Sequence, residues 1–321
     1  MIKSASAVIA LTFATFSVNA WNSLGHRAVA ELAWRHMDAA ERQAATDLLR
    51  QHPHYKNILT ADVPASVDTN EWAFLTAAVW PDLVRPAKNG QPPKPKSVTK
   101  YNVYPHGIEL PFLLPGEQDR SLLKNYSLAR TNGQTALMDC LATLKNRKAS
   151  AHDRAVSLCV VLHLYADLHQ PLHASALVTK EKPGGFGGGG GLLVRNPQGE
   201  RVGLHAFWDQ LPGSDLSYRG IMALADELAA DPALQPKALK EYRKNKRVPA
   251  WVRESWQVAA EFAYDPNRIQ YVEAPAARAR NLPDSAIPEV SAQYAKESRE
   301  IARKRLALAA LRLTDALKQV W

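Results

Sequence analysis

Cysteine is almost absent from this sequence. Its 321 residues include only two cysteines, Cys140 and Cys159, which excludes the small scaffolds that several disulfides hold together. Both lie in apolar stretches typical of helices, where they can either form one disulfide or remain two buried thiols. The sequence leaves these two alternatives open.

The sequence also lacks long apolar runs after its first twenty residues. No later stretch approaches eighteen uninterrupted apolar residues, so we expect no membrane-spanning helix in the rest of the chain. The stretch GGFGGGGG at 184–191 lacks the Lys-Ser/Thr ending of a phosphate-binding P-loop and predicts a flexible loop instead. With 46% hydrophobic and 22% charged residues, the chain is neither disordered nor collagen-like.

The first twenty residues are typical of an export signal. Lys3 precedes an apolar run from Ala7 to Val18, and the small residues around Ala20 fit a cleavage site. The run is short for a stable membrane helix, although a retained anchor is the alternative. Cleavage after Ala20 would make Trp21 the new N-terminus. The sequence therefore predicts a secreted or periplasmic protein.

The net charge is strongly positive. Forty lysines and arginines against 31 acidic residues give a formal charge of +9 and a pI near 9.5. Such a charge favours polyanionic partners, which include nucleic acid, anionic lipid and acidic polysaccharide.

Apolar residues recur mostly at helical spacing. We expect one mainly helical domain over residues 21–321, with a small β-hairpin whose turn is at 196–199. Residues 101–112 are β-like, and 85–97 predict an exposed loop. Helices are expected at 26–51, 62–80, 121–146, 152–169, 215–231, 249–263 and 288–319.

Two pairs of histidine and aspartate have the spacing of one helical turn. His163 and Asp167 form the first pair, and His205 and Asp209 the second. Residues four apart project from the same face of a helix, so each pair can bind one metal ion. Pro171 ends the first helix, and His173 can then point back toward the same cavity. Imidazole and carboxylate donors without cysteine suit zinc in a catalytic site.

Two further elements contain residues of the same chemistry. A free amine at Trp21 and its own carbonyl oxygen could chelate a metal ion that His26 also binds. Asp82 and Arg85, three residues apart, are either a structural ion pair or a pair that holds water and phosphate in a hydrolytic site. The other five histidines, His36, His52, His54, His152 and His169, receive no role.

The motifs together resemble one known family. The order of five motifs is similar to that in the S1/P1 nucleases, which are trinuclear zinc enzymes. The motifs are WNSLGH (21–26), WPDLVR (80–85), HGIELPF (106–112), HLYADLHQPLH (163–173) and LHAFWD (204–209). The resemblance implies an all-α fold of the phospholipase C/P1 nuclease type. It also implies three zinc ions and assigns their ligands. One set is Asp82, His106, His163 and Asp167; the second is Trp21, His26 and the bridging Asp167; the third is His173, His205 and Asp209.

The resemblance also implies a reaction. Zinc-activated hydroxide would attack phosphorus, with Asp82 orienting it and Arg85 stabilising the phosphoryl charge. Single-stranded DNA and RNA would be cut to 5′-phosphate products, and 3′-nucleotides would be dephosphorylated. Glu109 stands where the family often reads the base with a shorter residue.

Some positions depart from the family pattern. Gly107 replaces the usual aromatic residue, whose stacking on a base contributes roughly 1–3 kcal/mol, so Tyr104 or Phe186 would have to substitute for it. The glycine-rich loop lacks the family's asparagine. Two other functions therefore stay open: a zinc-dependent phospholipase C of the related fold, whose last ligand pair would be His-x-x-x-Glu, and a catalytically weakened zinc-binding or nucleic-acid-binding homologue.

Overall fold

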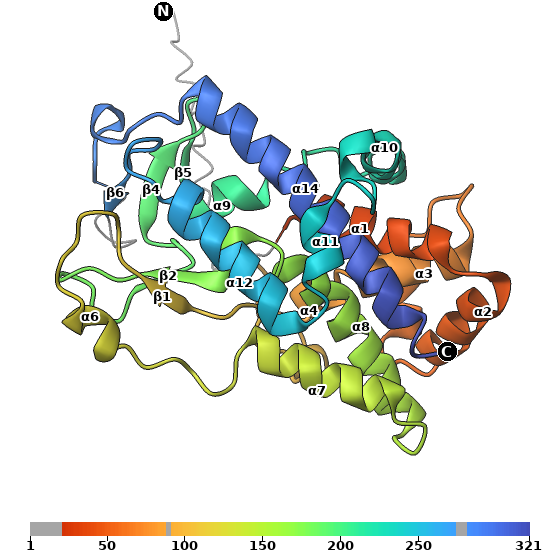
Figure 1. The fold of residues 1–321 in the computed structure, drawn as a ribbon. Coiled ribbons are helices and arrows are strands. Elements are labelled where there is room, and N and C mark those ends of the chain that lie inside the picture. The colour runs from red at the N-terminus through yellow and green to blue at the C-terminus, as the bar shows by residue number, and fades with distance from the viewer. Residues whose placement is uncertain (1–20, 88–90, 274–280) are drawn as a thin grey trace, which may run out of the picture.

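The computed structural model describes residues 21–87, 91–273 and 281–321. Helices dominate it, and two small sheets lie at one end (Figure 1). The long helices are α1 (Ser23–His36), α2 (Ala39–Leu49), α3 (Thr69–Ala77), α7 (Gly133–Lys145), α8 (Ala151–Asp167), α10 (Tyr218–Ala230), α12 (Val248–Val258) and α14 (Ala292–Leu317). The short helices are α4 (Trp80–Leu83), α5 (Lys96–Thr99), α6 (Ser121–Lys124), α9 (Leu204–Asp209) and α11 (Lys240–Lys244).

The strands form two three-stranded sheets. In the first sheet, β1 (Leu110–Phe112) pairs in parallel with β2 (Ser175–Leu177), which pairs antiparallel with β3 (Phe186–Gly187). In the second, β4 (Leu192–Arg195) lies between β5 (Arg201–Gly203) and β6 (Val272–Glu273), antiparallel to both. The hairpin β4–β5 leads directly into α9, as the sequence predicts. The fold class, mainly helical with little strand, is confirmed.

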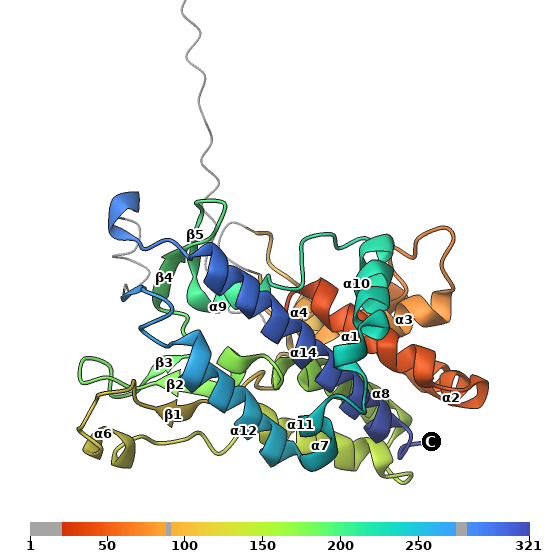
Figure 2. The same cartoon turned by 45° about the horizontal axis from the view of Figure 1, so that its top comes forward.

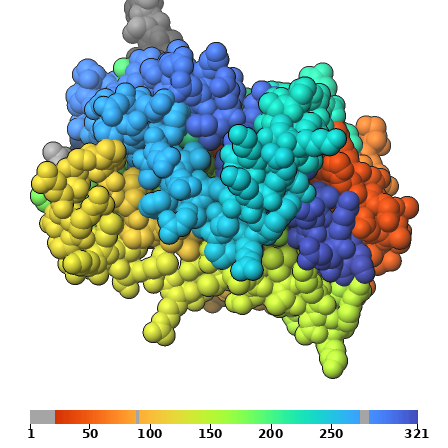
Figure 3. All heavy atoms as spheres, in the orientation of Figure 1, coloured from red at the N-terminus to blue at the C-terminus, as the bar shows by residue number. Residues whose placement is uncertain are grey.

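Helix α8 lies at the centre of the core. Ser150 caps its first turn, and every residue from Ala155 to Asp167 is buried. Helices α1, α7 and α14 pack against α8, and α14 crosses the molecule from the sheets toward α2 (Figures 1 and 2). Figure 3 shows that α11, α12 and α14 cover the middle and upper part of this face, and that the yellow and yellow-green regions of α6 and α7 lie at its left and bottom. The C-terminal end of α8 is therefore enclosed by elements from the second half of the chain.

Several boundaries differ from the sequence prediction. The helix expected at 26–51 is two helices, because the Asp38 side chain and Glu41 form a capping box that starts α2. Of the β-like stretch 101–112, only Leu110–Phe112 forms a strand. The loop expected at 85–97 lies partly outside the described residues. Cys140 and Cys159 are both buried and free, which settles the alternative of a disulfide in favour of two thiols.

None of the helices in the described part of the chain combines the length and apolar character that crossing a membrane requires.

Candidate metal centre

Helix α8 supplies the central side chains of a buried cluster. His163 and Asp167 project from its last turns, and His26 comes from the first turn of α1, which the Asn22 side chain caps. The Asp82 carboxylate comes from α4, and His106 comes from the segment before β1. The donor atoms form two groups, His26–His163–Asp167 and Asp82–His106–His163, each with all donors within 4.8 Å of one another. His163 belongs to both groups, so they are one continuous cluster.

The Asp167 carboxylate is surrounded by imidazole nitrogens. Its Oδ2 lies 3.0 Å from His163 Nε2 and 3.0 Å from His106 Nδ1. On the other side, Oδ1 lies 3.2 Å from His26 Nε2, without the alignment of a hydrogen bond. Asp167 and His26 are fully buried. One carboxylate therefore faces both groups, which is the position a bridging ligand requires.

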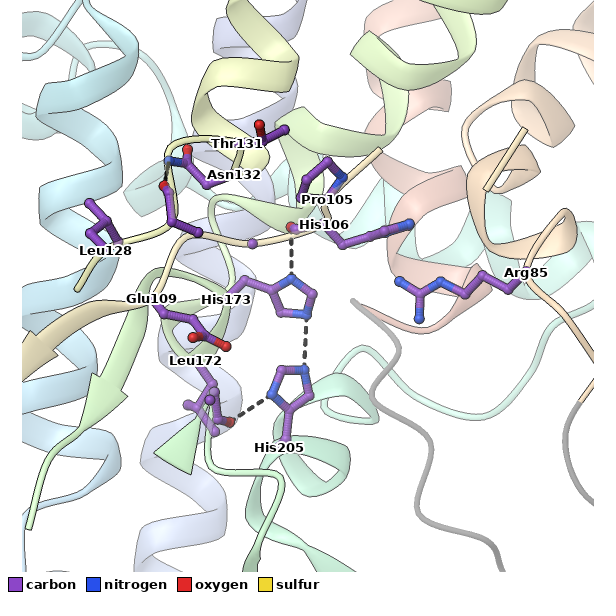
Figure 4. Close-up of a pocket in the computed structure, with 14 residues that line it drawn as sticks. Arg85, Pro105, His106, Glu109, Leu128, Thr131, Asn132, Leu172, His173 and His205 are labelled. Carbon is purple, nitrogen blue, oxygen red and sulfur yellow. Dashed lines mark hydrogen bonds between the residues drawn. The ribbon is translucent and has the colours of Figure 1, made fainter. Parts of the chain in front are cut away.

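A third group lies on the other side of the α8 terminus. It consists of His173, from the turn Pro171–Ala174, with His205 and Asp209 from α9, and its donors again lie within 4.8 Å of one another. His173 Nε2 and His205 Nε2 are 2.9 Å apart (Figure 4). His205 Nε2 also lies 3.4 Å from Asp209 Oδ2. All three side chains are buried. The structure thus brings the second predicted pair and the isolated histidine together.

Backbone carbonyls fix how three of the histidines present their rings. Nδ1 of His163 donates to Ala78 O at 2.7 Å, Nδ1 of His173 to His106 O at 3.0 Å, and Nδ1 of His205 to Gly188 O at 2.7 Å. A carbonyl can only accept, so Nδ1 of each ring carries a proton, and in the neutral form of the ring the lone pair is on Nε2. Such second hydrogen bonds are typical of metal-ligating histidine.

A bound cation would satisfy these buried donor atoms better than their contacts with one another do. His173 and His205 aim two Nε2 lone pairs at each other over 2.9 Å, an arrangement that a shared positive charge would stabilise. Asp167 Oδ1, Asp209 Oδ2 and His26 Nε2 are buried without a hydrogen-bond partner, which is costly unless something else compensates them. Ligands about 2.0–2.1 Å from a tetrahedral zinc lie about 3.3 Å apart. The observed spacings are close to that value.

Burial and neighbouring charges set the protonation of the cluster. Burial lowers the pKa of His26, and it lowers the pKa of His106 to about 4. Burial alone would raise the pKa of Asp167, but the adjacent His163 and the hydrogen bonds from His106 and His163 hold it well below its usual range. Burial would lower the pKa of His163, but Asp167 and Asp82 raise it, so without a metal this ring keeps its second proton. Metal binding would displace that proton and leave neutral imidazoles around an ionised carboxylate.

A cavity of about 440 Å³ opens beside the third group. Arg85, Glu109, His106, His173 and His205 line it together with Pro105, Gly107, Leu128, Ala129, Thr131, Asn132, Leu172, Gly187 and Gly188. Figure 4 shows Arg85 and Glu109 on opposite sides of the His173–His205 pair. Arg85 Nε lies 3.0 Å from Asp82 Oδ1, so the predicted pair of carboxylate and guanidinium is formed at the edge of the cavity.

The glycine at position 107 is required by the backbone around it. A Cβ there would lie 2.7 Å from His173 O, and Ile108 N donates to the same oxygen at 2.7 Å. Glu109 lines the cavity, and its Oε2 accepts a hydrogen bond of 3.4 Å from Tyr126. The cavity therefore has a carboxylate at this end and no aromatic ring at position 107.

The sequence predicts a flexible loop at 184–191, but two of its glycines pack closely against neighbouring side chains and backbone. A Cβ on Gly188 would lie 2.6 Å from His205 Nδ1, and one on Gly187 would lie 2.4 Å from Glu109 Oε1. Gly188 N donates to Ser175 O at 3.1 Å. Gly188 also has a left-handed φ of 55°, which favours glycine. Two of these glycines are thus part of the wall of the cavity.

Trp21 is fully buried and directly precedes α1. It packs against Gly25, where an added Cβ would lie 2.9 Å from the Cβ of Trp21. It precedes His26 by little more than one helical turn, so the two can serve one site.

Sequence reasoning missed Gln170, whose side chain donates to Asp209 Oδ1 at 2.8 Å, and the cavity wall at 128–132. A single glutamine has no spacing signal, and 128–132 lie far in sequence from every ligand.

Comparison with known proteins agrees with this geometry. The S1/P1 nuclease family matches the chain over residues 21–321, which include every residue of the three groups. Among curated proteins no match is found. Since the family match spans nearly the whole sequence and the three groups are compatible with a trinuclear metal site, the chain belongs to the S1/P1 nuclease family, a family of nucleic-acid-cleaving hydrolases.

Proposed function

We propose that this protein is an exported, zinc-dependent nuclease that hydrolyses single-stranded DNA and RNA to 5′-phosphate products and removes phosphate from 3′-nucleotides. Three zinc ions would be held by the ligand sets that the resemblance implies. Asp82, His106, His163 and Asp167 form the first set, and the Trp21 amine and carbonyl, His26 and Asp167 form the second. His173, His205 and Asp209 form the third.

The observation that carries this proposal is the donor chemistry of the buried cluster. Lone pairs of His173 and His205 face each other at 2.9 Å, and carboxylate oxygens of Asp167 and Asp209 are buried without hydrogen-bond donors. Hydrogen-bonded networks normally satisfy buried polar atoms, and metal sites are the common exception. When bound, zinc supplies Lewis-acid stabilisation of phosphoryl charge and acidifies water enough for hydrolysis near neutral pH.

The residues of the chain would orient the substrate. Arg85 borders the cavity, and its guanidinium can donate to phosphoryl oxygens while its Nε stays ion-paired with Asp82 Oδ1 at 3.0 Å. Burial would raise the pKa of Asp82, but His163, Arg85 and His106 lower it, so the carboxylate stays ionised and can accept a proton from an attacking water. Charge stabilisation by prearranged donors is usually the largest catalytic contribution.

The far end of the cavity would receive the nucleobase. Glu109 is a hydrogen-bond acceptor in this wall and would select bases that present N–H groups. Gly107 supplies no stacking surface, so the base would depend on Glu109 and on the apolar contacts of Leu128 and Leu172. We therefore expect weaker binding of the base than in a site that has a ring at position 107.

The proposal includes removal of residues 1–20. A free amine at Trp21 is a metal donor, whereas the same nitrogen in a peptide bond is a poor one. Support comes from the signal-like composition of residues 1–20 and from the position of Trp21 beside the turn that contains His26. The N-terminal residue of the exported protein, identified by mass spectrometry, tests this part.

The central experiment uses protein that begins at Trp21. We expect close to three zinc ions per chain by elemental analysis, cleavage of single-stranded DNA and RNA that a chelator abolishes and zinc restores, and 5′-phosphate ends on the products. Duplex DNA and phosphatidylcholine vesicles are the comparison substrates. Bound zinc with hydrolysis of phosphatidylcholine alone would identify a phospholipase C instead, and bound zinc with no hydrolysis would identify an inactive homologue.

A further inference from the structure

A second buried polar cluster lies directly behind the metal centre. It joins α12 and α14 to the turn that follows α8, and it consists of Glu254, Ser255, Arg305, Arg312 and His169. All five side chains are buried; Arg305 is 3% exposed and Arg312 5%. Charged side chains are rarely buried unless they are paired and hydrogen-bonded, so this cluster needs an explanation that the proposed reaction does not provide.

One carboxylate pairs with both arginines. Glu254 Oε2 accepts from Arg305 Nη1 at 2.7 Å and from Arg312 Nη1 at 3.0 Å. Its Oε1 accepts from Arg312 Nη2 at 2.8 Å and from Asn245 Nδ2 at 2.6 Å. Glu254 contacts only some of the N–H groups of each guanidinium. The other N–H groups of both arginines are therefore available for another partner.

Those donors converge on the turn Leu168–Gln170. Arg305 Nε donates to the carbonyl oxygen of His169 at 3.0 Å, and Arg312 Nη1 donates to His169 Nε2 at 2.8 Å. His169 Nδ1 in turn donates to Tyr165 O at 2.6 Å. The ring also stacks on Trp251, with centroids 4.6 Å apart.

Ser255 completes the attachment. Its hydroxyl donates to Leu168 O at 2.6 Å and accepts from Arg305 Nη2, also at 2.6 Å. The carbonyl oxygens of Leu168 and His169, just after α8, therefore each accept a hydrogen bond from a buried side chain of α12 or α14. These contacts close a rigid connection between three segments that are far apart in sequence.

The turn lies between ligands of different groups. Asp167 precedes it, His173 follows it by three residues, and Gln170 within it donates to Asp209 Oδ1 at 2.8 Å. Gln170 Oε1 also accepts from Leu172 N, and His173 N donates to Gln170 O at 3.1 Å. A displacement of the turn would move the carboxylate at the centre of one cluster and two ligands of the other.

We propose that Arg305, Arg312, Glu254 and Ser255 form a positioning cluster that fixes the Leu168–Gln170 turn and thereby sets the distance between the Asp167 and the His173–His205–Asp209 parts of the metal centre. This inference rests on the proposed zinc binding. The cluster touches neither substrate nor metal. It acts through His169, to which the sequence analysis gives no role.

The test compares lysine substitutions at two arginines of α14. Arg305→Lys keeps the charge but loses the planar fork that reaches His169, Glu254 and Trp251 together. Arg303→Lys is the matched control, because Arg303 lies on the same helix and, among the described residues, forms its ion pairs with Glu227 and Asp231, away from the turn. Ser255→Ala is a second variant, which removes a single hydroxyl and is therefore compatible with folding.

Three measurements separate positioning from general stability. They are zinc affinity by competition with a chelator well below the unfolding temperature, the visible spectrum of the cobalt-substituted protein, and thermal unfolding without metal. We expect Arg305→Lys to weaken zinc binding by about 10- to 100-fold, as loss of groups that orient ligands does, and to alter the cobalt spectrum. Ser255→Ala should show a smaller loss in the same direction, and Arg303→Lys none.

Wild-type zinc affinity and cobalt spectrum in both Arg305→Lys and Ser255→Ala would overturn the inference, even if their unfolding temperatures fell. If Arg305→Lys does not fold, Ser255→Ala decides the outcome alone. A wild-type protein that holds no zinc would refute the proposed function as well. Zinc binding in the wild type with unaffected variants would refute only the positioning role.

Discussion

The Asp167 and Asp209 sides of the metal centre use the same residue types in different surroundings. Asp167 has three histidine nitrogens within 3.2 Å of its oxygens, whereas Asp209 has one histidine nitrogen at 3.4 Å and the Gln170 amide. The pKa of Asp167 lies well below its usual range, but burial raises the pKa of Asp209 well above it. The proposed ligand sets give these two carboxylates different roles, a shared ligand at Asp167 and a ligand of a single ion at Asp209, and the predictions below test that difference.

The largest expected effect comes from Asp167→Asn. The amide removes the negative charge that faces two groups of donors, so the sites of two ions are weakened together. Each ion contributes several kcal/mol of charge stabilisation, and each 1.36 kcal/mol corresponds to a tenfold change in rate. We therefore expect a loss of about 10⁴-fold or more in kcat/KM. Elemental analysis should find at most one zinc per chain. Full zinc content would contradict the bridging role.

An N-terminal extension tests the Asp167 side without changing a side chain. Protein that retains Ala20 has an amide where the amine of Trp21 would bind metal. We expect about one zinc fewer per chain and a loss of about 10²- to 10³-fold in activity, the contribution of one ion, with an unchanged unfolding temperature of the metal-free protein. Full activity of the extended protein would show that the amine is not a ligand.

Asp209→Asn should have a smaller effect than Asp167→Asn. Only the third group loses its carboxylate, and the Gln170 amide can rotate to pair with the new side chain. We expect loss of one zinc ion and about 10²-fold in kcat/KM, with the other two ions retained. Equal losses in the two variants, with all metals bound in both, would remove the distinction between the two sides.

The sequence predicts the metal centre better than its surroundings. His163, Asp167, His205 and Asp209 were recognisable because ligands on one helix repeat every four residues. The capping box that starts α2 was missed, although Asp38 and Glu41 have the required spacing.

The supporting contacts were not readable from spacing. Arg305 lies 136 residues from the carbonyl of His169 to which it donates, and no local pattern connects positions that only the tertiary fold brings together. Glu109 was recognisable only from the order of motifs. Glycines 187 and 188 suggested flexibility because glycine permits two opposite uses, a mobile loop and a close approach of backbone to side chain. The structure shows the second.

Gly188→Ala gives the smallest effect and tests the Asp209 side alone. Its Cβ would lie 2.6 Å from His205 Nδ1, so the ring must move and its hydrogen bond to Gly188 O must change. Gly199→Ala is the matched control, because Gly199 has a similar left-handed φ of 78° and open space around it. Both variants should lose about 1–2 kcal/mol of stability from the backbone.

Only Gly188→Ala should also weaken one zinc site, by about 10- to 100-fold, because it disturbs the group that orients His205. Zinc titration with each variant distinguishes the two contributions. If both alanines lower stability and leave all zinc affinities alike, the glycine-rich wall has no part in setting the His173–His205 distance. If Gly188→Ala loses its zinc from the Asp209 side while the two ions near Asp167 remain, the two sides bind their ions independently, and the glycine-rich wall acts on the Asp209 side alone.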